Sequence, residues 1–187
     1  MEHNREPVRG GSAGEDAGAE ADGGVRLRRL MELYGGDVWH YAYFLTRSRD
    51  LADDIAQDTF VKAYASMDSF RGEAAIKTWL LSIARNAAFS RRRSAFARRA
   101  VLMAEPPERE TAASAEDDYM RRSDNEEIWR IVMKLPDRYR EVLVLDLKHG
   151  LPLAEISRLL GIAEGTVKSR LFRARDKVGK RLKEERR

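Results

Sequence analysis

The stretch LPLAEISRLLGIAEGTVKSRLFRAR, residues 151–175, holds two helical patterns separated by a short turn. Pro152 suits the first turn of a helix, where its missing N–H group leaves no hydrogen bond unmade. The apolar residues that follow at helical spacing are Ile156, Leu159 and Leu160. Gly161 then ends the pattern, Ile162 anchors the turn, and a second helix opens at Gly165-Thr166. This order predicts a helix-turn-helix.

The second helix separates into two faces when its residues are projected at about 100° per residue. The narrow apolar face, which must pack inward, contains Val167, Leu171, Ala174, Val178 and Leu182. The opposite face contains Ser169, Phe172, Arg173 and Asp176, with Lys168 at its edge. An outward Phe beside an outward Arg suits a helix in the major groove. There Arg reads guanine edges, and an apolar group meets the thymine methyl.

The C-terminal end of the chain is basic. From Lys168 onward it carries ten Lys or Arg residues and three acidic ones. A lone basic amphipathic helix is more often a solvated surface than a binding site. Here the preceding helix and turn are in register, which favours a DNA-reading helix followed by a tail that attracts phosphates.

Composition excludes several classes of protein. The chain has 187 residues, of which 43% are hydrophobic and 35% charged, as in charge-rich globular proteins of one or two domains. It lacks cysteine, and its three histidines are scattered, so we expect no metal site. With neither a glycine-rich phosphate loop nor a nucleophile–base pair, we predict no enzyme activity and no cofactor. Without a signal peptide or a membrane-length apolar run, we expect a cytoplasmic location.

The chain divides by composition into four segments. Residues 1–24 are rich in Gly, Ala and acids and are expected to be a disordered leader. Residues 25–99 are helical in pattern, with a break at Gly35-Gly36 and a new helix capped by Asp37. Residues 100–124 are predicted to be a flexible acidic linker, and residues 125–187 are predicted to form the second helical part. The prediction is an all-α fold of two small helical domains joined by the linker.

Two stretches of the N-terminal part carry polar patterns. DLADDIAQDTFVKAY (50–64) gathers Asp53, Asp54, Gln57 and Asp58 near one face, although an ordinary solvated acidic face is the alternative. In SFRGEAAIKTWLLSIARNAAFSRRR (69–93), Trp79 and Ile83 are expected in the core rather than as a base-stacking platform. The polar residues off that core stripe are Arg85, Asn86, Arg92 and Arg93. With Arg71-Gly72, they would line a groove for single-stranded nucleic acid.

Together these stretches resemble a known family. DLADDIAQDTFVKAY, the SFRGEAAIKTWLLSIARN segment and LPDRYREVLVLDLKHGLPLAEISRLLGIAEGTVKSRLFRAR are similar to the extracytoplasmic-function (ECF) subfamily of sigma-70 RNA polymerase sigma factors. The likeness covers about residues 25–99 (region 2) and 125–183 (region 4). The chain departs from many relatives at Pro152-Leu153, where they carry Ser-Tyr, and at Ser157, where they carry Ala. Its leader is also longer than usual.

The resemblance implies roles for particular residues. Contact with the β′ clamp helices of core RNA polymerase is implied for Asp54, Gln57 and Asp58, and contact with the β flap for region 4. Recognition of the melted −10 element is implied for Phe70, Arg71, Gly72 and Asn86, with Arg85 and Arg92 on the backbone. Recognition of the −35 duplex is implied for Lys168, Ser169, Phe172 and Arg173, with Thr166 on a phosphate. An anti-sigma factor is the further expected partner, and no membrane insertion is expected.

Two other readings of the sequence stay open. A stand-alone helix-turn-helix regulator would bind duplex DNA without polymerase, and its N-terminal half would serve as a sensor or a dimerisation domain. A helical adaptor protein with a basic face would show no preference among DNA sequences.

Overall fold

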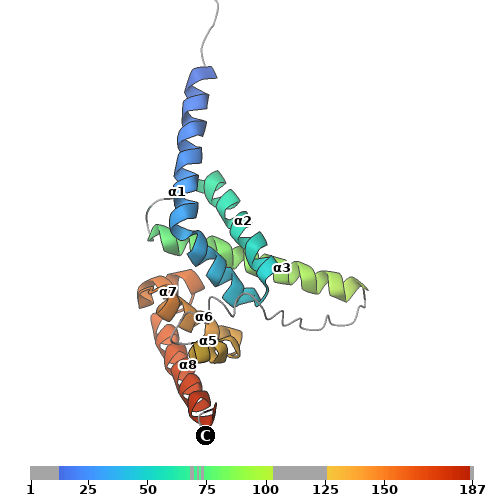
Figure 1. Ribbon diagram of the computed structural model, residues 1–187, viewed down its shortest axis with the longest axis vertical. Coiled ribbons are helices and arrows are strands. Elements are labelled where there is room, and N and C mark those ends of the chain that lie inside the picture. Colours follow the sequence, from blue (N-terminus) through green and yellow to red (C-terminus); the bar gives the residue numbers. More distant parts are fainter. Residues whose placement is uncertain (1–12, 68–69, 71, 73, 103–125, 186–187) are drawn as a thin grey trace, which may run out of the picture.

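The computed structural model describes residues 13–67, 70, 72, 74–102 and 126–185. All regular elements of this part of the chain are helical, as the sequence predicts (Figure 1). They form an N-terminal bundle of three helices and a C-terminal bundle of four helices and one π-helical turn. The N-terminal bundle consists of α1 (Ala13–Thr46), α2 (Arg49–Ser66) and α3 (Ile76–Leu102). The C-terminal bundle consists of α5 (Glu126–Met133), α6 (Asp137–Leu143), the π-helical turn η2 (Val144–Lys148), α7 (Leu153–Leu160) and α8 (Glu164–Glu185).

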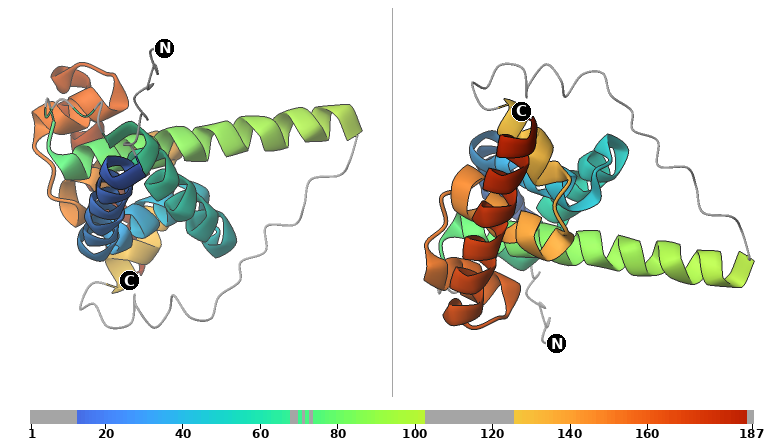
Figure 2. Two further views of the ribbon diagram at one scale, coloured as in Figure 1. Left: turned by 90° about the horizontal axis from the view of Figure 1, so that it is seen from above. Right: turned by 90° about the horizontal axis from the view of Figure 1, so that it is seen from below.

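The N-terminal bundle is held by apolar faces that all three helices turn inward. Its buried residues include Val38, Tyr41, Ile55, Leu80 and Leu81. Ser48 precedes α2 in an extended conformation and accepts a hydrogen bond from the N–H of Leu51 at 3.4 Å, which caps the helix. The C-terminal end of α3 extends away from the bundle (Figure 2).

Helix α1 differs from the prediction in two ways. It runs unbroken through Gly35-Gly36, because burial of the following turns outweighs a cost of about 1 kcal/mol for each glycine. Asp37 therefore lies inside the helix rather than at its start. The helix also begins at Ala13, within the expected leader. A packed helix needs no new nucleus to extend through a stretch rich in alanine.

The C-terminal bundle is arranged around α8, which contacts α5, α6 and α7. Its buried core includes Ile131, Val142, Leu145, Ile156 and Leu171. The predicted acidic linker lies outside the described residues, apart from the last turn of α3.

The two bundles pack directly against each other, which the sequence did not predict. One hydrophobic cluster spans both bundles, and α1 contacts α6 while α3 contacts α7. The rings of Phe44 on α1 and Trp129 on α5 lie 5.3 Å apart. The described parts therefore form a single body from which the far end of α3 projects (Figures 1 and 2).

Candidate functional site

The helix-turn-helix forms where the sequence predicts it. Helix α7 ends at Leu160, and the next residue is Gly161, whose φ of 66° lies in the left-handed region that glycine adopts without strain. The hydroxyl of Ser157 donates to the carbonyl of Ile162 at 2.6 Å and fixes the turn. Helix α8 then begins at Glu164, one residue before the expected start.

The two faces of α8 are confirmed. Val167, Leu171, Ala174 and Val178 are buried, and Leu182 packs partly against the core. On the other side Phe172 is 75% exposed, the highest fraction among the large apolar side chains of the described residues. Lys168, Ser169 and Arg173 are exposed beside it, and Thr166 is half-buried at the start of the helix.

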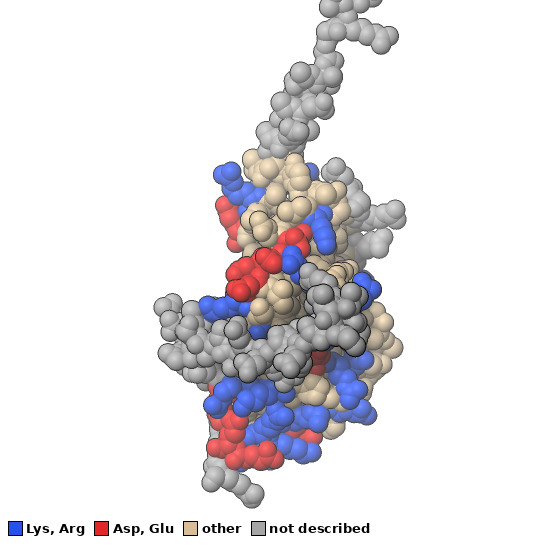
Figure 3. All heavy atoms as spheres, turned by 90° about the vertical axis from the view of Figure 1, so that its right-hand side faces the viewer, with Lys and Arg blue, Asp and Glu red and all other residues tan. Residues whose placement is uncertain are grey.

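The exposed face of α8 continues onto α6 through a group of cations around Tyr139. The guanidinium of Arg138 lies 4.8 Å from the centre of the Tyr139 ring, and Lys177 Nζ lies 5.7 Å from it. A hydrogen bond from Arg173 to the Tyr139 hydroxyl lowers the pKa of that hydroxyl. Arg138 and Tyr139 lie on α6, so the pattern of α8 alone could not show that they lie beside Arg173 and Lys177. Figure 3 shows Lys and Arg gathered over the lower part of the molecule, where the C-terminal bundle lies.

The acidic face of α2 is tied to α3 by one arginine. The two guanidinium nitrogens of Arg91 donate to Asp54 Oδ2 at 2.8 Å and to Asp58 Oδ2 at 2.6 Å. Gln57, between them in sequence, is exposed. The fourth polar residue, Asp53, has a different role, since its carboxylate accepts a hydrogen bond from Trp39 Nε1 at 2.6 Å. This face is therefore an ordered surface that keeps two carboxylates partly exposed.

The residues that the sequence predicts for a single-strand groove lie in different surroundings. The ring of Phe70 packs against Trp79, with 4.9 Å between ring centres, and Trp79 lies against the core as expected. Gly72 is exposed with a φ of 70°, and Asn86 is exposed on α3. Arg71 lies outside the described residues.

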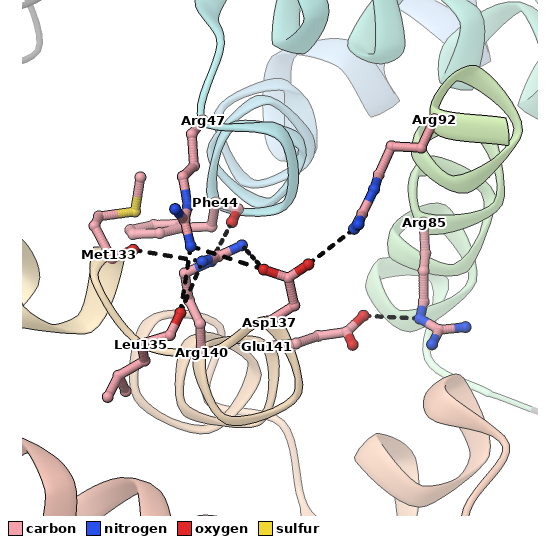
Figure 4. Close-up of polar contacts among 9 residues, drawn as sticks. All are labelled: Phe44, Arg47, Arg85, Arg92, Met133, Leu135, Asp137, Arg140 and Glu141. Carbon is pink, nitrogen blue, oxygen red and sulfur yellow. Dashed lines mark hydrogen bonds and ion pairs between the residues drawn. The ribbon is translucent and has the colours of Figure 1, made fainter. Parts of the chain in front are cut away.

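Arg85 and Arg92 lie elsewhere than in an open groove, because both point toward α6 (Figure 4). Arg85 Nε donates to Glu141 Oε1 at 2.8 Å, and Arg92 Nη1 donates to Asp137 Oδ2 at 2.9 Å. Burial alone raises the pKa of Asp137, but the nearby Arg140 and Arg92 outweigh that effect and lower it. Both arginines are therefore paired with carboxylates of α6, whereas Asn86 on the same helix is exposed.

The described residues were searched for membrane-spanning helices and for metal sites. No helix among them is long and apolar enough to cross a bilayer. The same ranges hold no cluster of His, Asp or Glu residues placed to bind a metal ion.

Comparisons with known proteins agree on one family. Residues 30–98 match the model of sigma-70 region 2, and residues 125–178 match that of sigma-70 region 4. The chain is 31% identical over 164 residues to the ECF RNA polymerase sigma factor SigW of Bacillus subtilis, covering 83% of this chain and 88% of the relative. It is 34% identical over 171 residues to the ECF RNA polymerase sigma-E factor of Haemophilus influenzae, covering 82% and 85%.

Solved structures give the same result. The sigma factor RpoE of Bartonella quintana, in complex with the anti-sigma factor NepR, superposes with a TM-score of 0.67 at 26% identity. That match covers 83% of this chain and 96% of the other. CnrH, in complex with the cytosolic domain of CnrY, shares the fold at 24% identity with a TM-score of 0.58. The chain therefore belongs to the sigma-70 family, within its group of ECF RNA polymerase sigma factors.

Proposed function

We propose that this chain directs transcription initiation by binding core RNA polymerase and reading two promoter elements. Region 4 would read the −35 duplex through α8, with Arg173 and Phe172 on base edges, Lys168 and Ser169 on bases or backbone, and Thr166 on a phosphate. The observation that carries this proposal is the exposed Phe172 beside Arg173, on a helix whose other face is fully used by the core.

Region 2 would contact both core polymerase and the −10 element. The ordered acidic face of Asp54, Gln57 and Asp58 would bind the β′ clamp helices, and region 4 would meet the β flap. Phe70, Arg71, Gly72 and Asn86 would hold an unpaired base of the −10 element, with Arg85 and Arg92 on its backbone. Unstacking such a base costs a few kcal/mol, so a base already separated by the polymerase is captured most easily.

The anti-sigma factor belongs to the same proposal. The relative from Bartonella quintana was solved with its anti-sigma factor, and that structure covers most of this chain. We infer that this chain also meets an anti-sigma factor, which would cover surfaces needed for polymerase or DNA.

Run-off transcription tests the function directly. Purified bacterial core polymerase is given a pool of duplexes with randomised −35 and −10 positions, with and without this chain. We expect defined start sites that are enriched only when the chain is present. A stand-alone regulator would bind duplex DNA without polymerase and enrich no start, and an adaptor would show no sequence preference. Either outcome contradicts the proposal.

A further inference from the structure

We propose that Arg138 of α6 and Lys177 of α8 bind backbone phosphates of the −35 duplex, next to the helix that reads its bases. Region 4 would then hold DNA with two helices, and the contact from α6 would fix how α8 lies in the groove. This inference rests on the proposed function, because it takes α8 as the helix that contacts the −35 duplex.

A cluster of three cations, the Tyr139 cluster, joins α6 to α8. Its members are Arg138, Arg173 and Lys177. The guanidinium of Arg138 and Nζ of Lys177 lie 4.8 and 5.7 Å from the centre of the Tyr139 ring. Arg173 lies close enough to the hydroxyl of that ring to lower its pKa. The tyrosine is 5% exposed and belongs to the core, whereas the three cations are exposed, so the ring holds them at one place on the surface.

The charge of the Tyr139 cluster is not neutralised by any carboxylate of the described residues. Other cations of α8 are paired, Arg175 with Asp146 at 2.7 Å and Lys180 with Asp176 at 2.8 Å. Two cations of the cluster stand four residues apart on α8, a spacing at which like charges repel. An anion that binds between them relieves this repulsion. The cluster therefore suits a ligand with negative charge.

The position of the cluster points to the DNA backbone as that ligand. The proposed base contacts lie on the first turns of α8, up to Arg173, and the N-terminal part of a recognition helix is the part that contacts base edges. Lys177 follows one turn later, about 6 Å further along the helix axis. Arg138 lies beside it, since both side chains contact the same ring. Cations at the edge of the groove meet phosphates there, and Figure 3 shows Lys and Arg gathered over this part of the molecule.

The two kinds of contact would do different work. A phosphate contact fixes the register and orientation of the protein on the duplex but carries no sequence information. Arg138 and Lys177 would therefore add affinity for every duplex, whereas Arg173 and Phe172 would add the preference for one −35 sequence. This difference separates the inference from the base contacts already proposed for α8.

Promoter binding at several salt concentrations tests the inference. The full-length chain is assembled with core polymerase, and fluorescence anisotropy gives the Kd for a duplex with the −35 element selected in the run-off assay. The variants are Arg138→Gln, Lys177→Gln and the double variant, all at exposed positions. Lys180→Gln is the matched control on α8, because it removes the same charge from a cation already paired with Asp176. Arg130→Gln is the control for Arg138, because Arg130 pairs with a carboxylate of α8 at 2.9 Å.

We expect each single variant to weaken binding by about the same factor for matched and altered −35 sequences. The slope of log K against log salt should become shallower by about one for each cation removed, because one fewer phosphate is neutralised. Both control variants should keep the slope of the wild type. Circular dichroism checks that each variant is folded.

A second measurement locates the contact on the DNA. A methylphosphonate replaces one phosphate of the duplex at a time and removes its charge. At one or two neighbouring positions this replacement should weaken binding of the wild type, but it should no longer do so in the double variant. Such a loss of effect is the coupling that a direct contact produces.

Two outcomes overturn the inference: salt slopes of Arg138→Gln and Lys177→Gln that match the wild type, or no methylphosphonate whose effect disappears in the double variant. A cluster that serves an acidic protein instead of DNA would give both results. Failure of the proposed function looks different, and the inference falls with it. In that case the wild-type assembly shows no preference among −35 duplexes and starts no transcription.

Discussion

Arg173 lies on the exposed side of α8, close enough to Tyr139 to lower the pKa of its hydroxyl. If it reads a base edge, Arg173→Ala should weaken binding to a −35 duplex by roughly 1–3 kcal/mol and relax the sequence preference at one position. Fluorescence anisotropy with duplexes that differ at single −35 positions measures both effects.

The matched control for Arg173 is Arg175→Ala on the same helix. Arg175 pairs with Asp146 of η2 at 2.7 Å, and its loss should leave the sequence preference unchanged. If Arg173→Ala instead weakens binding equally to every duplex, Arg173 contacts phosphate and not bases.

At the scale of single elements, the left-handed turn after α7 depends on one glycine. Gly161→Ala should destabilise the C-terminal bundle by about 1–2 kcal/mol, because a Cβ is strained at a φ of 66° although nothing lies within 4 Å of it. The control is Gly179→Ala inside α8, where the φ is ordinary and the space is open. That change should stabilise by about 1 kcal/mol through helix propensity. Thermal unfolding measures both, and equal effects would contradict the role of the turn.

The acidic face of α2 gives a second prediction at this scale. Gln57→Ala with Asp58→Ala should weaken the affinity for core polymerase, while circular dichroism shows that the chain still folds. Asp50→Ala is the control, since it removes an exposed carboxylate from the first turn of the same helix. Unchanged affinity for core polymerase in the double variant would remove the assignment of this face.

The sequence predicts an element correctly where the pattern lies within a few neighbouring residues. The periodicity of α8 separates Val167 and Leu171 from Phe172, because a helix repeats its faces every few residues. The expected break at Gly35-Gly36 was wrong for the opposite reason. Whether two glycines end a helix depends on how much the next turns bury, and that depends on helices distant in sequence. The start of α7 and the turn at Gly161 could be predicted without knowing how distant helices pack.

At the scale of the whole molecule, the packing of the two bundles against each other could not be predicted from the sequence. The contacts that join them pair residues far apart in the chain, such as Arg85 with Glu141 and Phe44 with Arg140. The sequence predicts Arg85 and Arg92 as contacts for DNA, and it does not show that Asp137 and Glu141 lie beside them. Two small bundles, each with a limited core, gain stability by sharing one hydrophobic cluster.

His149 offers a test of that shared core through pH. It follows η2 in the C-terminal bundle, and its Nδ1 lies 3.2 Å from Asp37 of α1, which also pairs with Lys77 of α3 at 2.9 Å. Because a carboxylate accepts, Nδ1 carries the proton, while Nε2 is buried without a hydrogen-bond partner among the described residues. Burial is the main reason that the pKa of His149 falls to about 4 from its usual 6.5.

The unfolded chain therefore binds a proton at His149 at a higher pH than the folded chain does. Between pH 6.5 and about 4 the unfolded state holds more protons, so the free energy of unfolding rises with pH and is lost as the pH falls. The loss for this histidine approaches about 3 kcal/mol at the acid end of the window. Urea unfolding at a series of pH values should show a steeper decline for the wild type than for His149→Gln, since both proteins share every other titrating group. Parallel curves would mean that His149 is not the buried neutral link between the bundles. A steeper wild-type curve would tie the stability of the chain to this contact between the two bundles.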